Sequence, residues 1–345
     1  MRRDLTLLLC GVGFLALLGY RYDLNATALL ERKWFFRFNR RYSEESPLRA
    51  NLDDINLTLP DSQEYRQARL KRVCLRYQDR LNRTRHRGRG SNFFPKTHQP
   101  RFCSTADCPL LVDLKHRFLF CFVQKVASTS AKVLFLREFR TPDRALRRDE
   151  VTALHEVAND KLLRVGPMYY GPKQLKTFHK AMFVRHPFER LVSVYEDKVG
   201  REPSEVSFFY DKYFKKFNGR RNITGTMSFV DFVDYLIETP RFEYDEHWMP
   251  YFERCEPCTV GYDFLGKLET ADSDFEAMLK VNGLDELEPR LKHLNARNES
   301  TFVEQFFIQL ERNQIMALYR IYRFDFELFG YNILNYIDTF DNGMF

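Results

Sequence analysis

Two segments in the middle of the chain each run from a buried strand through a polar loop into a helix, and they constrain the fold most. Residues 117–123 are a short apolar run with the length and composition of a buried strand. Residues 130–139 then show helical spacing of apolar side chains. Residues 181–184 are a second such strand, and Pro187 stands at the start of a helix over residues 188–199. Strands that alternate with helices predict an α/β fold with a parallel sheet.

The rest of the sequence indicates one large domain over residues 101–345. Further helices are predicted at residues 228–237, 271–281 and 302–329. With 44% hydrophobic residues, the 345-residue chain can bury a sizeable core. The net charge of +7 indicates anionic partners, but it does not choose among nucleic acids, acidic lipids, nucleotide phosphates and anionic glycans.

An apolar stretch near the N-terminus predicts a membrane anchor. Residues 5–20 are apolar, and a helix of that length rises roughly 24 Å, which suits a thin membrane. No small-residue cleavage site follows, so an uncleaved signal anchor over residues 5–21 is favoured over a cleaved signal peptide. The arginines before it predict a cytosolic tail, residues 1–4, and a lumenal body.

Cysteines and glycosylation motifs agree with a lumenal body. Outside the apolar stretch the cysteines form an even set, as an oxidising compartment favours: Cys74, Cys103, Cys108, Cys121, Cys255 and Cys258. The CxxC at residues 255–258 could also be half of a zinc site, but no second CxxC or histidine pair completes it. We therefore expect disulfides and no bound metal. The Asn-x-Ser/Thr sites predicted to carry glycans are Asn25, Asn56, Asn82, Asn222 and Asn298.

Residues 22–100 are predicted to form a lumenal stem and basic region. Between residues 66 and 101 the only acidic residue is Asp79, against many lysines and arginines. Such a stripe is either a solvated linker face or an electrostatic guide for a polyanionic glycan. Nucleic acid would fit the charge but not the predicted compartment, so no nucleic-acid partner is expected.

The loop of the first unit carries Lys125 and then hydroxyl side chains into the start of a helix. Backbone N–H groups at a helix N-terminus attract an anion, and the lysine adds a full positive charge. The loop lacks the glycines of GxxxxGK[ST], so it matches an ATP or GTP phosphate loop poorly. The same pattern also occurs as an ordinary connection between strand and helix.

In the second unit, Arg185 follows the strand and Ser193 lies two turns into the helix. A guanidinium and a hydroxyl placed in this way can hold a phosphate. The alternative is that Arg185 and Glu189 form an ion pair at the helix start.

Together these motifs resemble those of Golgi carbohydrate sulfotransferases. The sequences Lys125-Val-Ala-Ser-Thr and Arg185-His-Pro-Phe-Glu-Arg-Leu-Val-Ser are similar to the two motifs that bind 3'-phosphoadenosine-5'-phosphosulfate (PAPS) in that family. The nearest group comprises the GalNAc 4-O-sulfotransferases of chondroitin, dermatan and N-glycans and the glucuronyl 3-O-sulfotransferase. The resemblance departs at Gln124, where the family usually has proline. It continues through residues 244–248, 255–258, 262–270 and 324–331.

The resemblance implies a P-loop-like PAPS site in an α/β sulfotransferase core behind a single transmembrane helix. Lys125 would contact the bridging oxygen of the phosphosulfate, Thr129 and Ser130 the 5'-phosphate, and Arg185 with Ser193 the 3'-phosphate. The residues expected at the PAPS site are Gln124, Lys125, Val126, Ala127, Ser128, Thr129, Ser130, Arg185, His186, Pro187, Phe188, Glu189, Arg190, Leu191, Val192 and Ser193.

The same resemblance implies a glycan or glycosaminoglycan acceptor and a type II protein of the Golgi membrane. We expect transfer to O-4 of GalNAc, in chondroitin, dermatan or N-glycan chains. The alternative acceptor is O-3 or O-2 of a uronic acid. A P-loop kinase is a poorer interpretation, because no glycine-rich loop or magnesium-binding aspartate is evident. An inactive glycan-binding membrane glycoprotein is the alternative from another class, and it would have no affinity for PAPS.

Sulfuryl transfer needs one group that takes the acceptor proton and another that stabilises the leaving phosphate. Lys125 is predicted to stabilise the leaving phosphate. His247 is the leading candidate for the base, although it could instead be a core or acceptor-binding histidine paired with a neighbouring carboxylate. Glu269 is a less favoured candidate, and His186 is predicted to be structural.

Overall fold

The computed structural model describes residues 61–86, 109–113, 116–137, 177–284 and 299–341. They belong to one compact unit, Asp61–Phe345. The predicted anchor, residues 5–21, lies outside the described residues, as do Cys103, Cys108 and three of the predicted glycosylation sites: Asn25, Asn56 and Asn298. Within the described ranges, no helix combines the length and the apolar character needed to cross a membrane.

The described strands form one mixed sheet in the order β1-β2-β3-β4, with bounds Leu110–Asp113, Phe118–Cys121, His179–Val184 and Phe264–Lys267. Strands β2, β3 and β4 are parallel, as the sequence predicts. Strand β1 pairs antiparallel with β2, so the prediction of a wholly parallel sheet is wrong at this edge. Only four residues separate β1 from β2, too few for the crossover that a parallel pair requires.

Both predicted strand–loop–helix units are present. Strand β2 leads into α3, Ser128–Arg137, and β3 leads into α6, Pro187–Val194. A π-helical turn, η2, Tyr195–Val199, continues α6. The other described helices and turns are α2 (Gln63–His86), α7 (Ser207–Phe209), η3 (Tyr210–Phe214), α8 (Lys215–Arg221), α9 (Phe229–Glu238), η4 (Arg241–Glu243), α10 (Tyr251–Arg254), α11 (Pro257–Val260), η5 (Leu268–Thr270), α12 (Ala271–Val281), α13 (Glu299–Phe307), α14 (Arg312–Phe329) and α15 (Leu334–Asp341).

The helix predicted over residues 302–329 is interrupted. Residues 308–311 separate α13 from α14, and Glu311 caps α14 through reciprocal hydrogen bonds with Gln314. Such a capping box satisfies N–H groups at a helix start and so favours a new helix there. The helices predicted at residues 228–237 and 271–281 are confirmed as α9 and α12.

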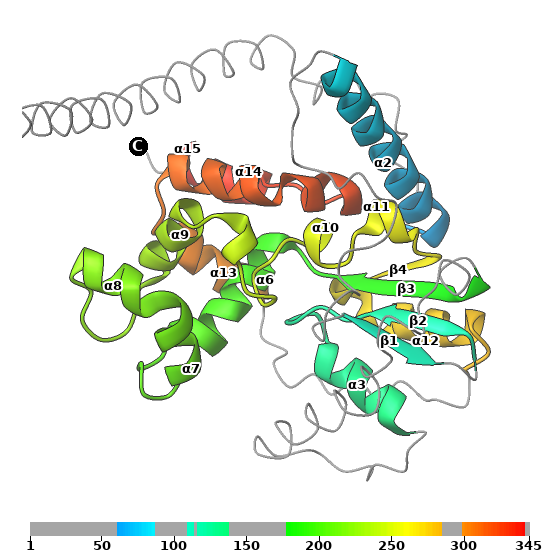
Figure 1. Cartoon of the computed structure of the whole chain (residues 1–345), viewed down its shortest axis with the longest axis horizontal. Helices are drawn as coiled ribbons and strands as arrows, with labels where there is room; N and C mark the ends of the chain where they lie inside the picture. Colours follow the sequence, from blue (N-terminus) through cyan, green and yellow to red (C-terminus); the bar gives the residue numbers. More distant parts are fainter. Residues whose placement is uncertain (1–60, 87–108, 114–115, 138–176, 285–298, 342–345) are drawn as a thin grey trace, which may run out of the picture. The chain divides into compact units, whose positions relative to one another are not determined.

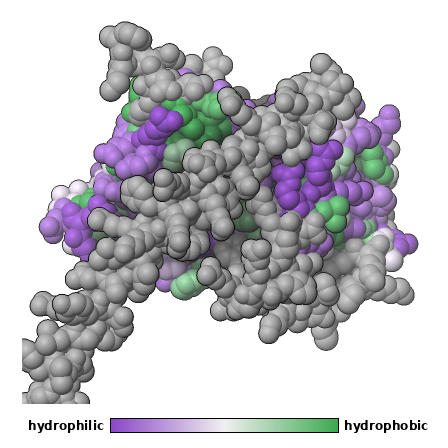
Figure 2. Space-filling model, turned by 90° about the horizontal axis from the view of Figure 1, so that it is seen from above, coloured by the Kyte–Doolittle hydropathy of each residue, from purple (hydrophilic) through white to green (hydrophobic). Residues whose placement is uncertain are grey.

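Two hydrophobic clusters form the core. The first surrounds the sheet and includes the stacked rings of Phe183 and Phe275, whose centroids are 4.0 Å apart. The second surrounds Trp248 and is built by α6, α8, α9, α13 and α14. Helix α14 contributes side chains to both clusters and therefore joins the sheet to the helical part (Figure 1). The face in Figure 2 mixes hydrophilic residues with smaller hydrophobic patches.

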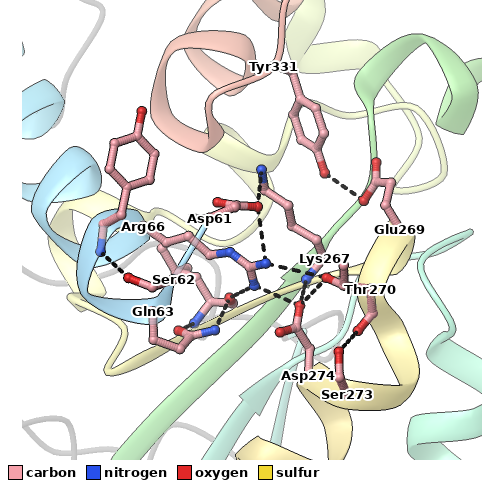
Figure 3. A network of polar contacts seen from close by, with 12 residues as sticks. Asp61, Ser62, Gln63, Arg66, Lys267, Glu269, Thr270, Ser273, Asp274 and Tyr331 are labelled. Carbon is pink, nitrogen blue, oxygen red and sulfur yellow. Dashed lines mark hydrogen bonds and ion pairs between the residues drawn. The ribbon is translucent and has the colours of Figure 1, made fainter. Parts of the chain in front are cut away.

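Helix α2 packs against this core, although the sequence predicts a stem there. Arg66 is 6% exposed, and it donates to Asp274 Oδ2 at 2.7 Å and to the Leu265 carbonyl at 2.9 Å. Gln63 bonds both backbone groups of Leu265 (Figure 3). The compact unit thus begins at Asp61 and not near residue 101, because long-range side-chain pairing attaches α2 to β4.

Two disulfides brace the first core cluster. Cys121, at the end of β2, is bonded to Cys255, and Cys74 of α2 is bonded to Cys258 of α11. The disulfide prediction is confirmed for these four cysteines. The CxxC is therefore not half of a zinc site, since each of its sulfurs is joined to a different element.

Candidate active site

The loop between β2 and α3 places Lys125 beside η2. Lys125 and Ala127 have φ values of 67° and 51°, in the region that usually favours glycine. Non-glycine residues in that region store strain, which tends to occur at functional sites. The Lys125 Nζ lies 3.2 Å from Asp197 Oδ2, and the lysine side chain is only 18% exposed. The loop therefore adopts backbone angles of a glycine-rich loop without glycine.

Several cations share this neighbourhood. Burial lowers the pKa of Lys125, Asp197 opposes that effect, and the positive charges of Lys198 and Arg185 lower the pKa further. Lys198 also lies 3.3 Å from Asp197. Three cations whose fields overlap form a site that suits a polyanion. Asp197 was not among the residues predicted for the site, because its distance from the loop in sequence gives no sign of the pairing.

Arg185 follows directly on β3 and is 8% exposed. Its backbone N–H donates to the Tyr251 hydroxyl at 3.0 Å, and that hydroxyl donates to its carbonyl at 3.0 Å. The Arg185 Nε lies 3.4 Å from Glu189 Oε2, so the ion pair considered as an alternative does form. A guanidinium has five N–H donors, so an ion pair through Nε does not by itself prevent it from binding a phosphate.

His186 caps the start of α6, as its structural prediction implies. Its Nδ1 accepts from the Phe188 N–H at 3.3 Å, and its Nε2 lies 2.9 Å from the Asn332 carbonyl. Burial lowers the pKa of His186 to about 4, against the opposing effect of that carbonyl. Glu269 accepts from the His186 N–H at 2.8 Å and from the Tyr331 hydroxyl at 3.0 Å (Figure 3). Both carboxylate oxygens of Glu269 are therefore engaged in holding this corner.

Much of the second motif is scaffold. Pro187, Phe188, Leu191 and Val192 are buried, and Ser193 is half-buried on α6. Arg190 is 1% exposed and donates to three carbonyls: those of Gln124, Glu246 and Met249, at 3.2, 3.1 and 2.8 Å. These carbonyls belong to the two loops that carry Lys125 and His247. Arg190 thus ties both candidate catalytic loops to α6, a role that spacing alone does not predict.

His247 is oriented by a carboxylate. Its Nδ1 lies 2.5 Å from Asp245 Oδ1, and the Tyr213 hydroxyl donates to Asp245 Oδ2 at 2.5 Å. Burial alone would raise the pKa of Asp245, but the bonds from His247 and Tyr213 outweigh it and lower the pKa to about 2. An ionised Asp245 favours the proton on Nδ1, which leaves the lone pair on Nε2. No partner among the described residues bonds that Nε2.

A pocket opens between α2 and the carboxyl ends of β3 and β4. It is lined by Asp61, Tyr65, Arg66, Arg69, Val184, Leu265, Lys267, Leu328 and Phe329. Val184 immediately precedes Arg185, so the pocket adjoins the second motif. Ligands of open α/β sheets bind at the carboxyl ends of the strands.

Fold and site together combine an α/β sheet with two strand–loop–helix units that place cations at their loops, an arrangement suited to an anionic ligand. The model of the sulfotransferase family matches residues 109–332, and the chain belongs to that family. Carbohydrate sulfotransferase 11 of Rattus norvegicus is 31% identical over 245 residues, which cover 66% of this chain and 68% of the relative. Carbohydrate sulfotransferase 10 of Homo sapiens is 28% identical over 307 residues, with 85% and 84% covered.

Carbohydrate sulfotransferase 12 of Mus musculus is 30% identical over 253 residues, which cover 64% of this chain and 59% of the relative. No solved structure shows a significant match. The resemblance stated from the sequence motifs is confirmed, and the protein is a sulfotransferase of the carbohydrate sulfotransferase group.

Proposed function

We propose that this protein transfers a sulfuryl group from PAPS to a glycan hydroxyl in the Golgi lumen. The observation that best supports the proposal is that Arg190 bonds the loops of both candidate catalytic residues. This one buried side chain bonds the carbonyl of Gln124, next to Lys125, and the carbonyl of Glu246, next to His247. A cation for the donor and a carboxylate-oriented histidine for the acceptor are thereby fixed to a common scaffold.

The residues present fit PAPS. The donor carries phosphates at both ends of its ribose, and Lys125, Lys198 and Arg185 form a group of cations with overlapping fields. When bound, PAPS supplies a sulfuryl group attached to a phosphate that can leave. Thr129 and Ser130 stand at the start of α3, where backbone N–H groups favour a phosphate. Arg185 and Ser193 would bind the 3'-phosphate.

Lys125 would stabilise the negative charge that develops on the leaving phosphate. A partly buried cation acts strongly here, because the local dielectric is lower than that of water. His247 would take the acceptor proton at Nε2 while Asp245 stabilises the resulting imidazolium through Nδ1. Lys125 and His247 thus divide the two tasks of the reaction between two loops.

For the acceptor we propose O-4 of GalNAc, in chondroitin, dermatan or N-glycan chains, with O-3 or O-2 of a uronic acid as the alternative. The similarity to carbohydrate sulfotransferases 10, 11 and 12 supports a sugar acceptor. A lumenal location behind an anchor at residues 5–21 is supported by the two disulfides and by the exposed Asn222 at the end of α8. Asn82 lies in α2.

The direct test is a transfer assay with 35S-labelled PAPS and four acceptors: chondroitin, dermatan, heparan and N-glycan chains. The proposal expects label in a glycan, and disaccharide analysis would identify the sulfated hydroxyl. An inactive glycan-binding protein would neither transfer label nor bind PAPS. Absence of both activities in folded protein would overturn the proposed function.

A further inference from the structure

An aromatic and basic surface extends outward from His247 along α7 and η3. We call Phe208, Phe209, Lys212 and Tyr213 the platform. The Phe209 ring meets the His247 ring edge-on at 5.2 Å, and Phe208 meets Phe209 at 5.3 Å. The Lys212 Nζ lies 5.3 Å from the Phe208 centroid and 4.8 Å from the Tyr213 centroid. The platform is thus continuous from the candidate base to the surface.

The platform is anchored at one end and open at the other. The Tyr213 hydroxyl donates to Asp245, the carboxylate that orients His247. Phe208, in contrast, is 63% exposed, and Lys212 is exposed beside it. Phe208 and Phe209 form a contiguous aromatic pair, and aromatic side chains are enriched at binding interfaces. Anything held on Phe208 would therefore have a fixed position relative to His247.

Two cations of α8, the helix that follows η3, are paired with carboxylates. Lys215 is paired with Asp211, and Arg221 is paired with Asp234 and Glu238. Among the described residues no carboxylate forms an ion pair with Lys212, which contacts the two rings instead. An unneutralised lysine on an exposed aromatic surface favours a ligand that has both an apolar face and a negative charge.

Two segments of backbone next to the platform are π-helical. Tyr195–Val199 and Tyr210–Phe214 are π-helical turns, which are rare and frequently occur at functional sites. The first turn carries Asp197, the partner of Lys125, and Lys198, whose Nζ lies 5.2 Å from the Phe209 centroid. The second turn carries Lys212 and Tyr213. The π-helical turns therefore link the donor cations to the platform.

We propose that the platform binds the acceptor chain beside its reactive sugar, and that this acceptor is an anionic polysaccharide containing uronic acid. A sugar ring presents an apolar C–H face that can pack on Phe208, while its carboxylate lies near Lys212. This inference rests on the proposed function and deepens it, because it selects chondroitin- or dermatan-type chains over neutral N-glycans. The acceptor's negative charge would complement an otherwise unpaired cation.

The test uses Phe208→Ala, Lys212→Ala and Lys212→Glu in the full chain, with unsulfated chondroitin as acceptor. Each alanine variant should raise the acceptor KM about threefold to tenfold, and the glutamate variant should raise it at least about tenfold. Affinity for PAPS and kcat at saturating acceptor should remain near wild type. The Lys212→Ala effect should shrink at high salt, whereas the Phe208→Ala effect should persist.

Two exposed positions on α12, which packs on the sheet, serve as controls. Val281 is 64% exposed, and Lys280 beside it is exposed. Val281→Ala and Lys280→Ala should leave the acceptor KM unchanged. Since all four positions are exposed, thermal unfolding should show that the variants remain folded.

The outcomes separate this inference from the proposed function. Wild-type transfer to chondroitin with an unchanged KM in all three platform variants would overturn the platform but not the enzyme. Equal use of a neutral N-glycan, with no effect of Lys212→Glu, would also overturn it. If wild type transfers no sulfate at all, the proposed function fails. Direct calorimetric titration with chondroitin would then test the platform by itself, and equal binding by wild type and Lys212→Glu would reject it.

Discussion

The two strand–loop–helix units differ in how their residues are held. In the first unit, Lys125 extends from a loop with two positive φ angles, and its bond to Asp197 joins two half-buried side chains. In the second unit, His186 and Arg190 are buried, and their side chains bond four backbone carbonyls between them. The longer motif therefore contributes mainly architecture, and the shorter one holds a partly buried cation in a loop. The length of such a motif therefore reflects the packing of its side chains as well as the binding of a ligand.

The largest effect on kcat is expected at His247, because this side chain is proposed to take the acceptor proton. His247→Ala should lower kcat roughly a hundredfold to ten-thousandfold while affinity for PAPS stays near wild type. Asp245→Asn should lower kcat as well, because it removes the charge that orients and supports the histidine. Steady-state kinetics and PAPS titration check this. An unchanged kcat with a higher acceptor KM would make His247 an acceptor contact instead of the base.

Lys125→Ala should lower kcat by about a hundredfold to a thousandfold, as loss of one electrostatic stabiliser typically does. Affinity for PAPS should also fall, since the charge already meets the donor before reaction. Lys125→Arg keeps the charge and should recover part of the binding but less of the turnover. Wild-type turnover in Lys125→Ala would remove the first unit from the chemistry.

Arg190→Ala tests the architectural role of the second unit. It would leave three carbonyls without their donor, and we expect a loss of roughly 3 kcal/mol or more in the free energy of unfolding. Arg220→Ala is the matched control, because Arg220 is exposed and its ion pair with Glu238 is 3.7 Å long. Denaturant unfolding of both variants gives the comparison. Similar stabilities would show that Arg190 is not a structural tie.

Arg185→Ala should lose a charge-assisted contact with the 3'-phosphate worth roughly 1.5–3 kcal/mol. Affinity for PAPS should therefore fall about tenfold to a hundredfold. Lys280→Ala on α12 serves as the control for removing a cation elsewhere. If Arg185→Ala and wild type bind PAPS equally while both are folded, Arg185 serves only its ion pair with Glu189.

The smallest expected effect concerns pH. The pKa of His186 is lowered to about 4 by burial, so between pH 6.5 and 4 the unfolded chain binds a proton that the folded protein does not. The contribution of His186 to the free energy of unfolding is fully present above pH 6.5. It decreases as the pH falls, by roughly 1–2 kcal/mol at pH 5. His186→Asn keeps a capping acceptor but does not titrate. Its unfolding free energy should fall less steeply with pH, and identical slopes would contradict the assignment.

The sequence predicts the local features of the fold well. Strands β2 and β3, helices α9 and α12, and the positions of Lys125 and Arg185 follow from apolar runs and turn residues within short windows. The features that it missed depend on contacts between distant segments. The bond from Asp197 to Lys125, the three carbonyls on Arg190 and the docking of Arg66 on Asp274 involve partners far apart in the chain. No local pattern encodes such pairs.

The most direct test of the account is a calorimetric titration of PAPS into the wild-type protein, with ATP as the matched ligand. The account predicts saturable binding of PAPS at one site and weaker binding of ATP, because Arg185 and Ser193 would contact a 3'-phosphate that ATP lacks. Arg185→Ala should reduce the difference in affinity between PAPS and ATP. Absence of PAPS binding, or equal affinity for PAPS and ATP in the wild type, would contradict the account.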